Sequence, residues 1–282
     1  MKIRKTVVRV LDHRAFPYVV VGIILFFFLL PIAWTLITSL KTLKEAFLTP
    51  PTYFPKHPTL DAYKNVILNS PVPLYIWNSL IYSLSTVAII LTAGVVTAYG
   101  LSKYQYPGSN FILISFLVTR ILPPLSLLLP FYIIFRMMGL IDTKLSVIIF
   151  SVYLAYPLSV WILKSFFDTF PNQLIDAGLI DGCSRIGVLS RIVLPGVATG
   201  VAAVAIIAFL WTWQEFLSPY LFLNSDFNKP ITVGVYYFVG DELTYWHTIS
   251  AAAMFASIPG MVFFLIAQKY IVRGLTMGGV KG

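Results

Sequence analysis

Six stretches of the sequence are long, apolar and almost free of charge, and they limit the possible folds more than any other feature. Each has about the 20 apolar residues that a helix needs to cross a bilayer, or more. Five of them carry no ionised side chain, and the third holds only Arg120. The sequence therefore predicts an all-α polytopic membrane protein with six transmembrane helices in one domain of 282 residues. The expected helices are 16–40, 76–102, 110–135, 145–163, 192–214 and 248–268.

The composition excludes several other classes. Hydrophobic residues make up 58% of the chain and charged residues 11%, which leaves too little polar surface to cover a soluble enzyme. The net charge of +9 could suggest nucleic-acid binding, but the basic residues flank apolar stretches and form no stripe with interleaved aromatics. One cysteine, Cys183, and three scattered histidines give neither an internal disulfide nor the spacing of a metal site. We therefore expect no nucleic-acid partner and no metal on this chain.

The distribution of Lys and Arg predicts the orientation in the membrane. If the N-terminus is cytoplasmic, the inner segments hold 12 of the 20 basic residues and the outer segments hold 7, with Arg120 as the remaining one. Cytoplasmic loops of membrane proteins carry an excess of Lys and Arg. The chain is therefore expected to be a multi-pass protein of the cell membrane with both termini in the cytoplasm.

Prolines predict where one helix is irregular. Pro123, Pro124 and Pro130 lie within the third stretch, close to Arg120. A proline inside a helix removes a backbone hydrogen bond and clashes with the preceding turn. We expect this helix to be bent or broken.

The expected cytoplasmic loop 164–191 has the pattern of two short helices joined by a glycine. Pro171 suits a first helical position after Asp168 or Thr169 as the cap. The helical spacing continues to Gly182, and Ser184 can cap the second helix. On the inner face of a membrane protein such a hairpin can lie on lipid headgroups or can dock a soluble partner, and the pattern alone leaves both readings open.

The residues of this loop resemble a known motif. Asp176-Ala177-Gly178, three residues, Gly182, nine residues and Ile192-x-Leu194-Pro195 reproduce the spacing of the EAA motif of ABC-importer permeases. Asp176 stands where the motif usually has glutamate, and Gly178 stands where it has alanine. A glycine weakens a helix by about 1 kcal/mol relative to alanine. In this family the motif forms a coupling helix that sits in a cleft of the cytoplasmic ATPase. The resemblance implies that the contact is made by Asp176, Ala177, Gly178, Asp181, Gly182, Ile192, Leu194 and Pro195.

The resemblance also implies how the work is divided among subunits. The chain contains no Gly-x4-Gly-Lys-Ser/Thr loop, the phosphate-binding signature of many ATPases. ATP and magnesium are therefore expected on a separate ATPase subunit, and this chain is expected to be no enzyme and to bind no cofactor. The implied fold is that of the MetI-like permeases.

Further segments are similar to the carbohydrate-uptake branch of these permeases, of the maltose-permease type. They are Trp77-Asn78-Ser79-Leu80, Gly139-Leu140-Ile141-Asp142-Thr143 and Trp213-Gln214-Glu215-Phe216-Leu217. Residues 274–282 resemble the tail that reaches into the ATPase dimer in this branch, and their four glycines suit an extended backbone in a narrow cleft. The tail residues expected to contact the ATPase are Gly274, Leu275, Thr276, Gly278, Gly279 and Lys281.

Candidates for the substrate pathway or its gate are ionisable and aromatic residues near the apolar stretches. An ionised group within a membrane usually faces a cavity or a partner. Glu215 can serve an outer gate or contact the binding protein, or it can end a helix in solvent. Arg120 can line the pathway or contact a partner permease, or it can pair with backbone carbonyls around Pro123 and Pro124. Aromatic faces can stack on sugar rings, although most Trp and Tyr are expected in interfacial belts. The candidates are Arg120, Tyr156, Trp211, Trp213, Gln214 and Glu215.

The expected function is that of a permease subunit in an ATP-driven, binding-protein-dependent importer of a disaccharide or oligosaccharide, of the maltose or trehalose type, working by alternating access. One chain cannot enclose a pore, so the expected partners are a second homologous permease, two copies of a cytoplasmic ABC ATPase, an extracellular or periplasmic sugar-binding protein and membrane lipid. One alternative is an importer of glycerol 3-phosphate or another polyol, because Arg120 would suit a phosphate. The other is a self-sufficient secondary transporter, which usually shows an internal repeat.

Overall fold

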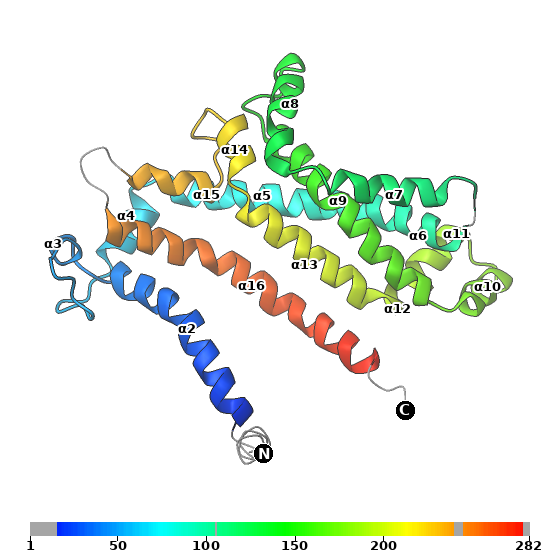
Figure 1. Cartoon of the computed structure of the whole chain (residues 1–282), viewed down its shortest axis with the longest axis horizontal. Coiled ribbons are helices and arrows are strands. Elements are labelled where there is room, and N and C mark those ends of the chain that lie inside the picture. The colour runs from blue at the N-terminus through cyan, green and yellow to red at the C-terminus, as the bar shows by residue number, and fades with distance from the viewer. Residues whose placement is uncertain (1–15, 105, 240–244, 279–282) are drawn as a thin grey trace, which may run out of the picture. The chain divides into compact units, whose positions relative to one another are not determined.

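The computed structural model describes residues 16–104, 106–239 and 245–278, and this part of the chain is built from helices (Figure 1). Within these residues, four helical segments are long and apolar enough to cross a membrane: Pro17–Ser39, Val72–Lys103, Lys144–Thr169 and Trp246–Ile266. Two bent pairs, Ser109–Thr119 with Pro124–Met137 and Arg185–Gly196 with Ala198–Gln214, bring the number to six if each pair forms one span. The prediction of an all-α polytopic membrane protein is therefore confirmed.

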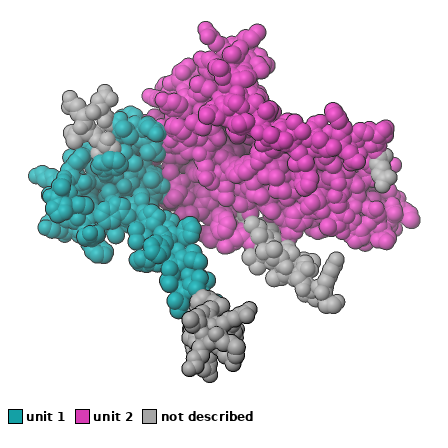
Figure 2. Space-filling view, in the orientation of Figure 1, with its two compact units in different colours: residues 1–70, 235–255 teal, residues 71–234, 256–282 magenta. Residues whose placement is uncertain are grey.

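The chain divides into two compact units, residues 1–70 with 235–255 and residues 71–234 with 256–282 (Figure 2). In the first unit, α2 (Phe16–Ser39) is followed by the short helices α3 (Leu43–Ala46) and α4 (Asp61–Leu68). The Ser39 hydroxyl lies 2.8 Å from the Tyr63 hydroxyl and ties α4 to the end of α2. None of the most apolar window of α2 is buried within the described structure. That surface is therefore available to lipid or to another subunit.

The core of the second unit lies where α5 (Val72–Ile89) and α6 (Val95–Lys103) pack against α9 (Lys144–Thr169) and α13 (Ala198–Gln214). α5 and α6 continue into each other through the π-helical turn η1 (Ile90–Gly94). Small polar side chains on α5, including Ser79, Ser83 and Thr86, are buried in this unit. Small residues let membrane helices approach closely, which explains why they are found there.

The third expected helix is broken, as its prolines predict. α7 (Ser109–Thr119) and α8 (Pro124–Met137) are bent by 99° relative to each other. Pro123 has an extended backbone with φ −60° and ψ 129°, and Pro124 begins α8, where its missing N–H is not needed. Arg120 ends α7 just before the break.

The boundary after the fourth expected helix differs from the prediction. α9 continues to Thr169 instead of ending at Leu163, and Asp168 in its last turn forms a 2.7 Å ion pair with Lys164. A pair of opposite charges four residues apart favours a continued helix. The prediction that Asp168 or Thr169 caps the next helix is therefore wrong, because both residues belong to α9 and Pro171 occupies the cap position.

The fifth expected helix, 192–214, is not continuous. The π-helical turn η2 (Leu189–Val193) and α12 (Leu194–Gly196) precede α13, and the chain bends by 81° between the two parts. Pro195 cannot donate a helical hydrogen bond, and Val197 leaves the helical region with φ −110° and ψ 20°. The first turns of α13 lie close to α9, since a Cβ atom at Gly200 would overlap the Phe166 ring.

The last helix is longer than expected. α16 (Trp246–Gly278) extends beyond the predicted end at residue 268 and includes the first part of the tail. The prediction of an extended backbone from Gly274 is therefore wrong as far as Gly278. A glycine in a helix interior costs about 1 kcal/mol relative to alanine but does not by itself end the helix. The predicted tail contacts Gly279 and Lys281 lie outside the described residues.

Candidate functional site

The first candidate site is the EAA hairpin, residues 172–196, which begins with α10 (Asn172–Ile180) and α11 (Arg185–Val188) at the end of α9 (Figure 1). α10 ends in a Schellman motif, in which the Cys183 N–H donates to the Gly178 carbonyl at 3.0 Å and the Gly182 N–H donates to the Leu179 carbonyl at 3.1 Å. Gly182 has φ +84°, a left-handed conformation that glycine adopts without steric cost. The predicted turn at Gly182 is confirmed.

Ser184 begins the second helix of the EAA hairpin, as predicted. Its Oγ accepts the Gly187 N–H at 3.1 Å and so satisfies one of the free donors at the start of α11. The end of α10 and the start of α11 are thus both satisfied by neighbouring residues. The residues of the turn therefore determine its backbone geometry.

Gly178 faces the interior of the EAA hairpin. It is buried, and a Cβ atom there would overlap the Cδ1 methyl of Ile192 and lie 3.3 Å from a methyl of Val188. Glycine in place of the usual alanine therefore makes room for Ile192, another residue of the same motif. The prediction that Gly178 itself contacts a partner does not hold, because the hairpin covers it.

The outer surface of the EAA hairpin carries carboxylates beside exposed apolar side chains. Asp176 and Asp181 are exposed, and neither forms an ion pair within the described part of the chain. Ile180 is 85% exposed and Ile186 is 78% exposed. Exposed apolar groups rimmed by polar ones are typical of an interaction surface. Ala177 is exposed in the same helix, so this face can approach a partner closely.

The EAA hairpin is fixed to the end of α6 by contacts that the sequence analysis did not identify. Lys103 Nζ donates to the Phe170 carbonyl at 2.7 Å and to Asn172 Oδ1 at 2.9 Å. Arg185 Nη1 donates to the Tyr104 hydroxyl at 2.9 Å, and its guanidinium lies 5.4 Å from the ring centroid. These basic residues had served only to predict orientation, because no local pattern links α6 to a loop about 70 residues later.

The second candidate site is a cavity of about 230 Å³ between α9 and the end of α13, which we call the α9–α13 cavity. The α9 residues are spaced by three and four positions and so share one helix face. Three predicted pathway residues, Trp211, Gln214 and Glu215, line the cavity, whereas Ser151 had not been identified because a serine in an apolar helix gives no sequence signal. The full lining is Ser151, Leu154, Ala155, Trp211, Thr212, Gln214 and Glu215.

Arg120 contacts two residues of this lining. Its Nη1 donates to the Leu154 carbonyl at 3.0 Å, and its guanidinium carbon lies 4.6 Å from the centroid of the Trp211 ring. Leu154 lies in the turn before Pro157, which has no N–H to donate to the carbonyl of the neighbouring Tyr153. Of the roles expected for Arg120, pairing with a backbone carbonyl is found, but the carbonyl lies on α9 and not around Pro123 and Pro124. A role in the pathway or at a partner permease stays a prediction.

Glu215 caps the helix that follows it. Its Oε1 accepts the Ser218 N–H at 2.8 Å at the start of α14 (Leu217–Phe222), and its main-chain carbonyl accepts the Thr232 hydroxyl at 2.7 Å. The residue is half-buried. Glu215 thus ends α13 and also caps α14, and its role at a gate stays a prediction. Its Oε2 makes no hydrogen bond to the residues that the structure describes.

Tyr156 and Trp213 do not line the α9–α13 cavity. The Tyr156 hydroxyl lies 2.7 Å from the Thr97 hydroxyl on α6. Trp213 is buried and stacks on Phe209, with ring centroids 5.6 Å apart. Both side chains pack within this chain. Of the six predicted pathway residues, three therefore line the cavity, Arg120 contacts its lining, and these two do neither.

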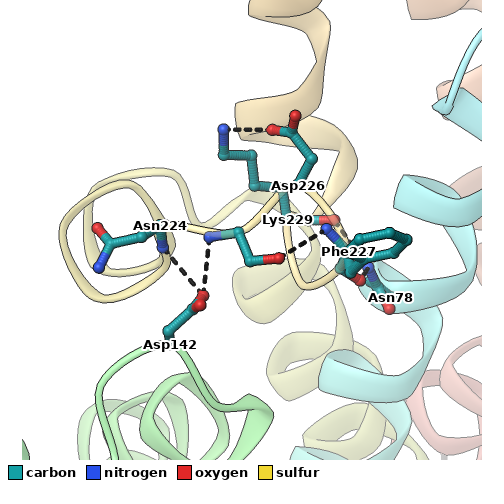
Figure 3. A network of polar contacts seen from close by, with 7 residues as sticks. Asn78, Asp142, Asn224, Asp226, Phe227 and Lys229 are labelled. Atoms are coloured by element: carbon teal, nitrogen blue, oxygen red, sulfur yellow. Dashed lines mark hydrogen bonds and ion pairs between the residues drawn. The ribbon is translucent and has the colours of Figure 1, made fainter.

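A polar network holds the loop after α14 (Figure 3). Asp142 Oδ1 accepts the backbone N–H of Asn224 at 3.0 Å and that of the next residue at 2.9 Å. Asn78 Nδ2 donates to the carbonyls of Phe227 at 2.8 Å and Lys229 at 3.0 Å. Asn78 and Asp142 belong to two of the segments that resemble the carbohydrate branch. Their role in this chain is to fix the loop that follows Glu215 and α14.

Metal ligands do not cluster in the described part of the chain, where no group of three or more His, Cys, Asp or Glu residues could hold an ion. Cys183 is a free, half-buried thiol in the turn of the EAA hairpin. Neither candidate site therefore has the donor set of a metal centre.

The similarity of this chain to known proteins extends over both candidate sites. Residues 90–277 match the family described as "Binding-protein-dependent transport system inner membrane component". The chain is 34% identical over 265 residues to the sulfoquinovosyl glycerol transport system permease protein SmoH of Agrobacterium fabrum, covering 94% of this chain and 93% of that one. It is 31% identical over 258 residues to the trehalose/maltose transport system permease protein MalG of Thermococcus litoralis, covering 90% and 92%.

The fold is similar to that of a chain in the crystal structure of a bacterial ABC transporter involved in the import of the acidic polysaccharide alginate. The TM-score is 0.79 with 18% sequence identity, over 90% of this chain and 94% of that one. At this identity the likeness concerns the fold alone. It agrees with the permease fold predicted from the sequence.

Proposed function

This chain belongs to the family of binding-protein-dependent transport inner-membrane components, and on that premise we propose that it forms half of the translocation pathway of an ATP-driven carbohydrate importer. Membership confirms the resemblance predicted from the EAA motif. It also makes the chain a permease subunit of an ABC importer, without a catalytic site of its own.

The coupling role rests on the outer face of the EAA hairpin. Its turn is fixed by its own hydrogen bonds, while Ile180 and Ile186 remain exposed beside Asp176 and Asp181. An element that transmits the movement of another subunit must keep its shape, and the EAA hairpin has a turn held by its own hydrogen bonds and a base held by Lys103 and Arg185. The proposed partner at this face is the ATPase, which binds ATP and magnesium and whose closure is transmitted through the hairpin to α13. The tail after residue 273 is proposed as a second contact.

The proposed substrate is a disaccharide or oligosaccharide. Two relatives at 31% and 34% identity are named for the transport of trehalose and maltose and of sulfoquinovosyl glycerol, all of which contain a sugar unit. The extracellular side would receive the sugar from a binding protein. A second permease would complete the pore, in keeping with α7, which has no buried residue within the described structure.

Reconstitution of the tagged, gently solubilised complex tests this function. Stoichiometric recovery of a second permease and an ATPase is expected, together with ATP-dependent uptake of labelled maltose or trehalose into proteoliposomes when the binding protein is added. Glycerol 3-phosphate is the comparison substrate. Recovery of this chain alone, moving solute without ATP, would contradict the proposal.

A further inference from the structure

A buried hydroxyl without a partner lines the α9–α13 cavity. Ser151 is 4% exposed, and its Oγ forms no hydrogen bond within the described structure. Ser159 on the same helix is 3% exposed, but its hydroxyl donates to the Ala155 carbonyl at 2.9 Å. α9 can therefore satisfy a buried serine internally, and it does not do so at Ser151. An unpaired buried polar group is costly, so a bound partner at this position would be stabilising.

Two further groups give the cavity hydrogen-bonding capacity. Gln214 is exposed and its amide makes no hydrogen bond to a described residue, while Glu215 uses only Oε1 for its cap. Thr212 is not available, since its hydroxyl donates to the Ala208 carbonyl at 3.0 Å. The available set contains hydroxyl, amide and carboxylate groups, which match the alternating donors and acceptors of a polyol. The carboxylate disfavours a phosphorylated ligand at the same place.

Trp211 adds an apolar surface next to these polar groups. Trp211 is 42% exposed, and the Arg120 guanidinium lies 4.6 Å from its ring centroid. Arg120 is held by the Leu154 carbonyl and does not itself line the cavity, whereas Trp211 does. An aromatic surface beside a few fixed polar groups is the usual composition of a small-molecule site.

We propose that the α9–α13 cavity binds one ring of a neutral saccharide during transport, with Ser151 and Gln214 bonding its hydroxyls and Trp211 packing on its apolar face. Arg120 is a positioning residue that holds Trp211. The cavity volume of about 230 Å³ lies below the range of about 300–1,000 Å³ for drug-sized ligands, which suits one ring rather than a whole oligosaccharide. This inference rests on the proposed function and assigns to this chain a direct contact with the sugar.

The test compares Ser151→Ala with Ser159→Ala, which removes an equally buried hydroxyl from the same helix. The complex of both permeases and the ATPase, washed free of binding protein, is titrated with whichever of labelled maltose or trehalose the wild type imports. Ser151→Ala should raise the Kd about three- to tenfold, as expected for one lost hydrogen bond, and Ser159→Ala should leave it unchanged. Gln214→Ala should act like Ser151→Ala. Trp211→Ala should weaken binding more, and Trp211→Phe should restore part of it.

A second measurement does not depend on the alanine variants being stable. In a Cys183→Ser background, Ser151→Cys introduces one thiol of nearly the same size into the cavity. Saturating sugar should slow its modification by a small methanethiosulfonate reagent severalfold. Unchanged Kd values together with an unprotected thiol would overturn the inference while leaving the importer function intact. Import of glycerol 3-phosphate alone, or recovery of this chain alone moving solute without ATP, would overturn both.

Discussion

In the turn of the EAA hairpin, neighbouring residues form the hydrogen bonds that the helix ends need. In the α9–α13 cavity, by contrast, several polar groups have no hydrogen-bond partner among the described residues. In the hairpin, the cap at Ser184 and the Schellman bonds around Gly182 occupy the helix ends at the turn. In the cavity, the Ser151 hydroxyl and one oxygen of Glu215 have no partner among the described residues. The first arrangement preserves a shape, and the second accepts a ligand. The two regions should therefore control different quantities, the coupling of ATP hydrolysis to transport and the affinity for sugar.

Gly182→Val should have the largest effect on the hairpin side of this comparison. The residue has φ +84°, and a β-branched side chain in that conformation costs about 1–3 kcal/mol, which would displace the turn. Sugar uptake per ATP hydrolysed should fall about tenfold or more, with the Kd for sugar unchanged. Both are measured on the reconstituted complex.

The matched control for this variant is Gly100→Ala. Gly100 lies within α6, and no atom is found within 4 Å of the position that its Cβ would take. Uptake per ATP should remain at the wild-type level. If Gly182→Val were coupled normally, the assignment of the hairpin to coupling would be wrong.

Gly178→Val should reduce coupling by a smaller factor, about fivefold, through the interior of the hairpin. The added methyl groups would collide with Ile192 and Val188, and overpacking typically costs 1–3 kcal/mol. Ile192→Ala removes the nearest obstacle, so the double variant should recover part of the lost coupling. A double-mutant cycle on uptake per ATP measures this interaction. Strictly additive losses would show that the two residues do not act through their contact.

The same two regions show what the sequence could and could not predict. The turn at Gly182 and the cap at Ser184 were predicted because their hydrogen bonds join residues up to five positions apart. The break after Arg120 was predicted from consecutive prolines. The cavity was not predicted as a site, since α9 and α13 contribute residues about 60 positions apart and no local rule brings Ser151 to Trp211.

The details that were missed follow the same logic. Glu215 was predicted as a pathway or gate residue and lines the α9–α13 cavity, but its cap on α14 was not predicted, because the start of that short helix could not be located beforehand. The acid–base pair at the end of α9 was not used in predicting where that helix ends, and the helix runs six residues longer than expected, to Thr169. Both differences concern the end of an element and leave the fold unchanged.

Arg120→Gln tests the cavity side of the comparison with a smaller effect. A cation over an exposed indole contributes about 0.5–1 kcal/mol, so the Kd for sugar should rise about two- to fivefold while uptake per ATP stays constant. Arg120→Lys keeps the charge but loses the planar contact and should lie between wild type and Arg120→Gln. A loss of coupling without any change in Kd would instead place Arg120 at a subunit interface.

The smallest effect is expected from acid, at a carboxylate outside both regions that is satisfied within its own loop. The Lys56 N–H donates to Glu45 Oε1 at 2.9 Å and lowers the pKa of Glu45 below its ordinary value of 4.5, with a further contribution from the Thr52 hydroxyl at 2.9 Å. A carboxyl group with a lower pKa in the folded state stabilises the fold fully above its unfolded value, and this contribution is lost as the pH falls through the folded pKa. Hydrogen exchange at Lys56, corrected for intrinsic rates, should therefore lose protection below about pH 4.5 in the wild type. Glu45→Gln should show weaker protection at pH 7 and no acid transition. A transition shared by both proteins would assign the acid sensitivity to another group, whereas a transition confined to the wild type would assign it to Glu45.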